Sequence, residues 1–227
     1  MGFSVQALIT PKAAAKLLFS DEIDVSGAWA PNSASKVLDE ILTIPIDEIL
    51  KIVDCNHYGK IADVRSIPQF GKVETIINVP SYFVKIGSCS ADYPQLGFFL
   101  KQDVNATLTA NTKFGENHGK AASILGIANC VHQRIVPSTL TYAFVELNHN
   151  QKEDIIKKLF FRIPAVQIIL CSAKNGTING YDPMTQLMES TKHRRSQCLR
   201  AVFRILREYD NVDLNARIDN IIWEDKT

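Results

Sequence analysis

Apolar residues in this chain recur in short groups at the spacing of an α-helix, and Gly, Pro and Asn residues separate the groups. Residues 33–42 and 46–53 each place an apolar stripe on one helix face, with Pro45 between them. Residues 149–162 and 164–171 repeat the pattern further along the chain. Because such short helices become stable mainly by packing their apolar faces together, the spacing predicts a mainly helical α+β fold.

The pattern changes between residues 115 and 147. We expect a helix at Lys120–Leu125 that Gly126 stops. Two β segments are expected at Val131–Val136 and Thr139–Leu147, around a turn at Pro137-Ser138. With the helix that follows, the order becomes helix, helix, hairpin, helix, which predicts winged-helix units with a small β-hairpin as the wing.

Two further segments complete the expected secondary structure. Val73–Val79 is apolar and β-branched, so both strand and helix stay open there. Ser190 is suited to cap a long helix that runs from Thr191 to about Tyr209.

Length and breaker residues predict two regions. The chain has 227 residues, of which 46% are apolar, and this suffices for one core of ordinary size or two smaller ones. Turn residues place a boundary within residues 56–72. We expect residues 1–70 to be a helical region of unknown role, with a short helix at Pro11–Phe19. Residues 71–227 are expected to form a winged-helix DNA-binding region that ends in a basic helix.

Cysteine usage and hydropathy predict a cytoplasmic protein. The five cysteines are scattered singly, with no Cys-x-x-Cys pair, and this favours reduced thiols and no metal site. No apolar run approaches the roughly 18 residues of a membrane span, and no basic leader precedes a long apolar core. We therefore expect no membrane partner. The formal net charge of +1 selects no partner by itself, so the distribution of charge matters more.

Residues 115–127 are the first candidate for DNA recognition. A recognition helix needs an apolar face that docks and a short polar face that enters the major groove. Small and aliphatic residues between 121 and 125 supply the apolar part. An ordinary amphipathic helix would show the same spacing, so that alternative stays open. The polar residues suited to base edges or phosphates are Asn117, His118, Lys120 and Ser123.

The wing is the second candidate. Val131 follows Gly126 too soon for a standard helix-turn-helix, which favours a helix that leads directly into a wing at Val131–Ile135. Gln133 and Arg134 would there reach the DNA backbone or the minor groove. A solvated turn with one arginine is the alternative.

The third candidate carries the strongest charge signal. Residues 191–207 contain six Lys or Arg residues and no acid. If this segment is helical, its apolar residues group on one side, and Arg200, Arg204 and Arg207 lie on the opposite side. Neighbouring arginines repel one another, and the phosphates of a duplex would relieve that repulsion. A solvated basic face is the alternative, as is a face paired with acids at Asp210–Asp213 or Glu224-Asp225.

The sequence leaves enzymatic activity open. It contains no Gly-x-Ser-x-Gly motif, no phosphate loop and no His-Glu-x-x-His motif. A metal-dependent nuclease needs paired carboxylates, often with a lysine nearby. Asp63 and Glu74 are a possible pair, although no lysine stands two positions after Glu74. Mg²⁺ is expected as a cofactor only if this pair forms an endonuclease site.

Residues of about 95–206 resemble the winged-helix DNA-recognition modules of bacterial restriction–modification proteins, in particular of some type II restriction endonucleases. The resemblance implies binding of double-stranded DNA in a setting of site-specific cleavage. It departs from those modules after Arg195, where Cys198 and Val202-Phe203 replace a threonine-headed helix that contains tryptophan. The segments that carry it are Gly115–Ala122 with Leu125-Gly126, Leu140-Thr141, Ile155-Ile156, Arg162-Ile163-Pro164 with Val166-Gln167, and Ser190-Thr191-x-x-Arg194-Arg195-x-x-Cys198.

The sequence and the resemblance together predict sequence-specific binding of double-stranded DNA, as the recognition part of a restriction endonuclease or restriction–modification protein. A homodimer or a partner nuclease subunit is possible in that setting. Two alternatives remain: a complete Mg²⁺-dependent endonuclease, and a protein-interaction module or transcriptional regulator. The residues expected to contact DNA are Asn117, His118, Lys120, Ser123, Gln133, Arg134, Lys192, His193, Arg194, Arg195, Arg200, Arg204 and Arg207.

Overall fold

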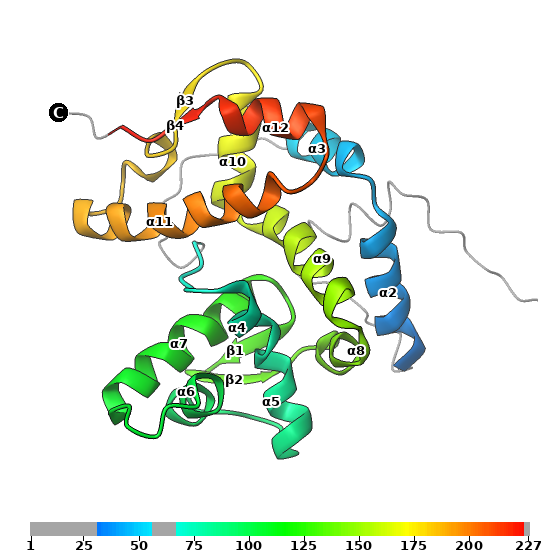
Figure 1. Cartoon of the computed structure of the whole chain (residues 1–227), viewed down its shortest axis with the longest axis vertical. Coiled ribbons are helices and arrows are strands. Elements are labelled where there is room, and N and C mark those ends of the chain that lie inside the picture. The colour runs from blue at the N-terminus through cyan, green and yellow to red at the C-terminus, as the bar shows by residue number, and fades with distance from the viewer. Residues whose placement is uncertain (1–30, 56–66, 225–227) are drawn as a thin grey trace, which may run out of the picture.

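The computed structural model describes residues 31–55 and 67–224 (Figure 1). This part is mainly helical and carries two small two-stranded sheets, which confirms the expected mainly helical α+β class. The segment Pro11–Phe19 lies outside the described residues. The helices are α2 (Pro31–Thr43), α3 (Ile46–Cys55), α4 (Val73–Ile77), α5 (Val79–Ile86), α6 (Tyr93–Lys101), α7 (Leu108–Ile124), α8 (Thr141–Glu146), α9 (His149–Leu159), α10 (Pro164–Ala173), α11 (Glu189–Leu206) and α12 (Val212–Asp219). The strands are β1 (Ala128–Val131), β2 (Arg134–Pro137), β3 (Ile178–Asn179) and β4 (Ile221–Ile222).

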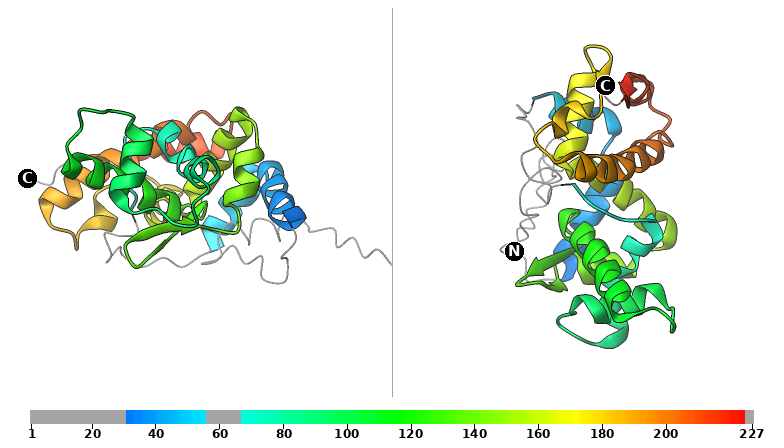
Figure 2. Two further views of the ribbon diagram at one scale, coloured as in Figure 1. Left: turned by 90° about the horizontal axis from the view of Figure 1, so that it is seen from below. Right: turned by 90° about the vertical axis from the view of Figure 1, so that its left-hand side faces the viewer.

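The elements gather at two ends of an elongated molecule (Figures 1 and 2). One end holds α4 to α8 with the antiparallel hairpin β1–β2. The other end holds α3, α10, α11 and α12 with the parallel pair β3–β4. Helix α9 runs between the two ends with α2 beside it, and one cluster of buried apolar residues extends through both.

The two N-terminal helices form where the apolar stripes predicted them, with Pro45 between them. Ile49 and Val53 of α3 are fully buried against α10 and α12. Helix α2 packs on α8 and α9, and the Lys158 ammonium of α9 donates a hydrogen bond to the Leu42 carbonyl. The described helices of the N-terminal region therefore share the core of the rest of the chain.

Helix α7 starts twelve residues before the helix expected at Lys120–Leu125. Its first turn is capped by the Thr107 hydroxyl, which accepts from the amide of Ala110 at 3.2 Å. The predicted helix started too late because Gly115 lowers helix propensity. In the structure Gly115 lies inside α7 and lets it approach α6 closely. A Cβ at Gly115 would lie 2.0 Å from the Tyr93 carbonyl oxygen. The expected stop is confirmed, since Gly126 follows the helix with φ of +80°.

The hairpin lies earlier in the chain than predicted, so the expected turn at Pro137-Ser138 is wrong. Ala128 pairs with Pro137 and Val131 with Arg134, and the turn residues are His132 and Gln133. Both turn residues have positive φ, 47° and 62°, as a two-residue type I′ hairpin turn requires.

The second expected β segment, Thr139–Leu147, forms the helix α8 instead. Leu140 and Phe144 are four residues apart and both fully buried, so the segment has helical rather than alternating periodicity. The Thr141 hydroxyl donates to the Ile127 carbonyl at 2.7 Å and accepts from the Ser138 amide at 2.7 Å. These bonds fix the start of α8 against the end of α7.

Two further segments form helices, but the expected cap at Ser190 is wrong. The open segment Val73–Val79 becomes α4 and the start of α5. Helix α11 begins at Glu189, before the expected Ser190 cap, and its N-cap residue Met188 makes no side-chain cap.

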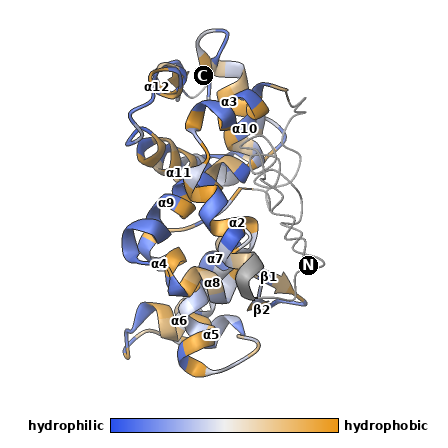
Figure 3. Cartoon of the chain, turned by 90° about the vertical axis from the view of Figure 1, so that its right-hand side faces the viewer, coloured by the Kyte–Doolittle hydropathy of each residue, from blue (hydrophilic) through white to orange (hydrophobic). Residues whose placement is uncertain are grey.

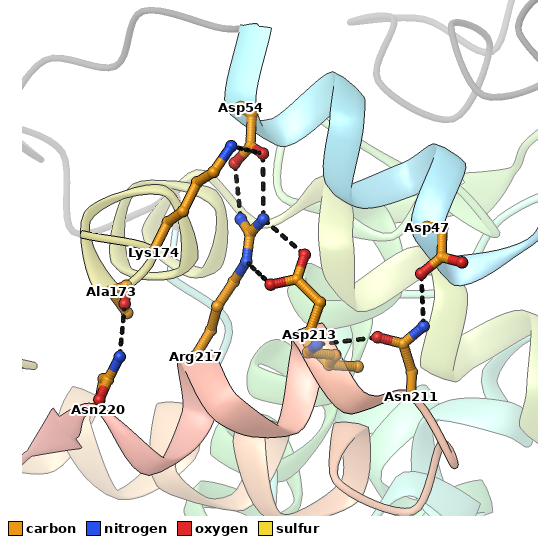
Figure 4. A network of polar contacts seen from close by, with 9 residues as sticks. Asp47, Asp54, Ala173, Lys174, Asn211, Asp213, Arg217 and Asn220 are labelled. Carbon is orange, nitrogen blue, oxygen red and sulfur yellow. Dashed lines mark hydrogen bonds and ion pairs between the residues drawn. The ribbon is translucent and has the colours of Figure 1, made fainter. Parts of the chain in front are cut away.

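A polar network holds the C-terminal helix α12 on α3 (Figure 4). The guanidinium of Arg217, whose side chain is 3% exposed, donates to both carboxylate oxygens of Asp54 at 2.6 and 3.0 Å. It also donates to Asp213 at 2.8 and 3.1 Å, and Lys174 reaches Asp54 at 2.6 Å. Burial would raise the pKa of Asp54, but the bonds from Arg217 and Lys174 outweigh burial and lower it.

Candidate nucleic-acid interface

The outer face of α7 carries two lysines around one acid. Glu116 accepts from the ammonium of Lys113 at 2.8 Å and from that of Lys120 at 2.7 Å. These hydrogen bonds lower the pKa of Glu116, so it stays ionised at neutral pH. Lys120 is exposed and its ammonium lies 5.7 Å from the Tyr93 ring centroid. Asn117, half-buried, stands beside them on the same helix.

His118 does not belong to this face. Its side chain is 3% exposed, so the structure removes it from the surface where DNA contact was expected. One ring nitrogen, Nδ1, lies 2.8 Å from the Phe114 carbonyl oxygen, and the amide of Gly71 donates to the other at 3.5 Å. Burial lowers the pKa of His118, which favours the neutral ring. The prediction of DNA contact by His118 is wrong because a helix that is recognised only from residue 115 onward does not show which of its polar residues faces the core.

The hairpin is fixed to α6 and α7 by hydrogen bonds. Ser123, expected to contact DNA, accepts from the amide of Cys130 at 3.1 Å and is half-buried, so its hydroxyl positions β1. Ala91, just before α6, exchanges both backbone hydrogen bonds with Ile135 of β2, at 2.7 and 2.9 Å. Ile135 is fully buried, while the tip residues Gln133 and Arg134 are exposed as predicted.

The α7 face and the hairpin form one continuous surface. The Tyr93 hydroxyl lies 3.5 Å from the Cys130 sulfur of β1, and the same tyrosine ring lies under Lys120. On this surface Lys113 and Lys120 pair with Glu116, and Arg134 is exposed at the hairpin. Lys113 was not among the predicted DNA contacts. It lies two helical turns before Lys120, so a helix predicted over the full length of α7 would have placed both lysines on one face.

The N-terminal half of α11 adds cations on the same side of the molecule. His193 and Arg194 are exposed. Lys192 pairs with Glu189 at 2.7 Å, and half-buried Arg195 donates to the Ile67 carbonyl at 2.7 Å. Arg195 also interacts electrostatically with Glu116 of α7, and both helices face the viewer in the right-hand view of Figure 2.

The C-terminal half of α11 lies in a different setting. Arg200, Arg204 and Arg207 line a cavity of about 390 Å³ whose opposite wall is formed by α12 and β4. The guanidinium of Arg200 lies 5.1 Å from the Trp223 ring centroid, and Arg207 pairs with Asp219. The structure thus divides the predicted basic stripe into an open N-terminal part and a concave C-terminal part.

The described residues contain neither a cluster of metal ligands nor a membrane-spanning helix. Within residues 31–55 and 67–224 no group of three or more His, Cys, Asp or Glu residues is arranged to hold a metal ion. Glu74 is exposed on α4, and its possible partner Asp63 lies outside the described residues. None of the described helices combines the length and apolar character that crossing a membrane requires.

Comparisons with family models, with curated proteins and with solved structures give no match to this chain.

Proposed function

We propose that this protein binds double-stranded DNA, with α7 placed in the major groove and the β1–β2 tip on the backbone beside it. One observation carries the proposal: the chain order α5, Ala91, α6, α7, β1, β2, in which Ala91 pairs with Ile135 of β2. Winged-helix modules have the same order, with a short strand before the second helix paired to the last strand of the hairpin. That pairing leaves the third helix, here α7, with an open outer face.

The charge of this surface fits a phosphate backbone. Lys113, Lys120 and Arg134 supply three cations, and Glu116 is the acid among them. Lysine and arginine contacts to phosphates position a protein on a duplex, whereas base edges are distinguished by side chains such as the Asn117 amide. The resemblance to restriction–modification modules supports a sequence-specific role, as the recognition part of such a system.

Salt dependence of duplex binding tests the proposal. Each phosphate contact releases counterions, so Lys120→Ala and Arg134→Ala should each lower the slope of log affinity against log salt by about one. The measurement is fluorescence anisotropy of a labelled random-sequence duplex pool at several salt concentrations. Lys51→Ala removes an exposed cation of α3 at the other end of the molecule, and it should leave the slope unchanged. Equal effects of all three variants would contradict the proposal.

Glu116→Gln gives a test with the opposite sign. It removes a negative charge from the proposed DNA face and releases Lys113 and Lys120 from their ion pairs. We expect tighter duplex binding, because phosphates then meet two unpaired ammonium groups. Weaker or unchanged binding would place the duplex elsewhere.

An endonuclease activity of the same chain is tested in the same mixture. Mg²⁺ is added to the bound duplex pool and the products are separated on a gel. Cleavage that Glu74→Ala abolishes would support a nuclease centre that includes Glu74. Retained, uncut DNA enriched in one short sequence would support a recognition module.

A second candidate function is protein interaction, and one surface favours it. Helices α5 and α6 contain residues that Figure 3 colours as hydrophobic, and several of these residues are exposed. Ile86 is 56% and Phe98 55% exposed, and both line a groove of about 530 Å³ together with Val104. Such a groove fits a second copy of this chain, which would make the protein a homodimer. Phe98→Glu should then shift the mass measured by light scattering from dimer to monomer, while a monomeric unmodified protein would exclude this role.

A further inference from the structure

The cavity at the C-terminal half of α11 is distinct from the proposed DNA face. Its lining combines three arginines at positions 200, 204 and 207 with the ring of Trp223 and one acid, Asp219. The spacing of four and then three residues places the three guanidinium groups along one face of the helix. Its volume of about 390 Å³ is within the range of small-ligand sites and exceeds what a single inorganic ion needs.

Arg200 is held in place before any ligand arrives. Its guanidinium lies 5.1 Å from the Trp223 ring centroid and 5.9 Å from that of Tyr181. It also donates to the Tyr181 hydroxyl at 3.1 Å. Trp223 is itself fixed, because its ring packs against Gly180 so closely that a Cβ there would lie 2.6 Å from it. A guanidinium ordered in this way loses little conformational freedom when it binds an anion.

The charge balance of the cavity favours an anion. Arg204 is exposed, Arg207 shares its charge with Asp219, and Arg200 is held by aromatic rings rather than by an acid. Planar guanidinium groups match the oxygens of a phosphate in a forked arrangement. The apolar part of the lining, Phe203 with Ile218 and Ile221, leaves room for an uncharged portion of the same ligand.

We propose that this cavity binds a phosphate monoester of nucleotide size, with its phosphoryl group on Arg200 and Arg204 and its uncharged part toward Phe203 and Trp223. The inference goes beyond the proposed function, because a concave site suits one phosphoryl group better than the convex backbone of a duplex. The phosphate ester could belong to a free nucleotide or to the 5′ end of a DNA strand, and the experiment separates these two sources.

Tryptophan fluorescence reports directly on this site. The chain has two tryptophans, so a full-length Trp29→Phe protein carries Trp223 as its single one. Adenosine 5′-monophosphate should change the Trp223 emission in a saturable way, whereas adenosine without phosphate should not. Calorimetric titration of the unmodified protein gives the same affinities without any substitution. A short duplex with and without 5′ phosphates is titrated in parallel.

One cation of the cavity and one outside it provide the matched variants. Arg204→Gln should weaken binding of the phosphate ester about tenfold or more, because it removes a charged hydrogen-bond donor from the cavity. The control is Lys51→Gln, which removes an exposed charge of α3 outside both the cavity and the proposed DNA face and should leave the affinity unchanged. Arg204-dependent binding of the mononucleotide assigns the site to free nucleotides. Such binding of the 5′-phosphorylated duplex alone assigns it to strand ends.

Three results would overturn the assignment. They are no saturable binding of either phosphate ester, equal binding of adenosine and its monophosphate, and equal losses for Arg204→Gln and Lys51→Gln. Failure here is distinguishable from failure of DNA recognition, since the latter depends on Lys120 and Arg134 and is measured with unphosphorylated duplexes.

Discussion

At the scale of single residues, the position of the proposed recognition helix α7 depends on glycines at which its backbone touches the backbone of α6. Gly115 of α7 and Gly97 of α6 stand opposite each other, and a Cβ at Gly97 would lie 1.8 Å from the Asn111 carbonyl oxygen. Only residues without a side chain permit this approach, and it brings α6 and α7 into the most extensive helix contact of the described chain. The orientation of α7 against the hairpin follows from this contact.

Gly115→Ala should therefore separate α6 from α7. We expect a loss of about 3 kcal/mol in the free energy of unfolding, because the new methyl group meets backbone that cannot move aside. Urea unfolding followed by circular dichroism measures the loss. Gly71→Ala is the matched control, since no described atom lies within 4 Å of its added Cβ, and it should change stability by less than about 0.5 kcal/mol.

His118 predicts a pH dependence of stability. Burial lowers its pKa in the folded protein below the ordinary value of 6.5. Between the lowered value and 6.5 the unfolded chain binds a proton that the folded chain does not, so stability is complete above 6.5 and falls as the pH drops through this window. The urea midpoint should decrease between about pH 7.5 and about pH 5.5. His118→Gln should remove this part of the decrease; an unchanged pH dependence in the variant would contradict a buried, neutral His118.

At the scale of elements, a buried charged side chain links α12 to α3. Arg217 is 3% exposed in its side chain and bridges Asp54 of α3 and Asp213 of its own helix (Figure 4). Asn211 adds a 2.7 Å hydrogen bond to Asp47. Because α12 and β4 form one wall of the arginine-lined cavity, this network also determines the shape of that cavity.

Arg217→Met should cost about 3 kcal/mol of unfolding free energy, because it leaves Asp54 largely buried with Lys174 as its remaining partner. The comparison variant is Arg207→Met, which breaks a pair whose side chains are 50% and 64% exposed and should cost less than about 1 kcal/mol. Chemical denaturation of both variants gives the two values. Similar losses would show that the network at Arg217 is no stronger than a surface ion pair.

At the scale of the whole molecule, the helices α7 and α11 both face the viewer in the right-hand view of Figure 2. The guanidinium of Arg195 in α11 donates a 2.7 Å hydrogen bond to the Ile67 carbonyl, upstream of α4, and this bond links the two ends of the molecule. A duplex that lies on α7 would then extend toward Arg194 of α11 if it is long enough.

Duplex length tests this arrangement. Arg194→Ala should lower the salt slope by about one for a duplex of two helical turns, roughly 20 base pairs, and leave it unchanged for one turn, roughly 10 base pairs. Lys120→Ala should lower the slope for both lengths. If Arg194→Ala has no effect at either length, α11 does not take part in duplex binding.

Expectations based on local periodicity agree with the structure. Four helices form where the sequence predicted them. They are the two with apolar stripes at 33–42 and 46–53, the helix from His149, and the helix with Pro164 in its first turn. A hairpin in this part of the chain was also predicted, but its turn was expected at Pro137-Ser138 and lies at His132-Gln133. These features depend on contacts between residues close in sequence, so the sequence contains the information that specifies them.

The sequence by itself thus determined the helical class, most helix positions and the presence of a basic α11. Tertiary structure alone decided which polar residues are exposed. His118 is buried and accepts a hydrogen bond from the amide of Gly71, and the Ser123 hydroxyl accepts one from the amide of Cys130 in β1. It also divided the arginine stripe, because α12 and β4 return from the end of the chain to cover one side of Arg200 and Arg207. The physical reason is that exposure and local charge depend on neighbours distant in sequence, which helical periodicity does not encode.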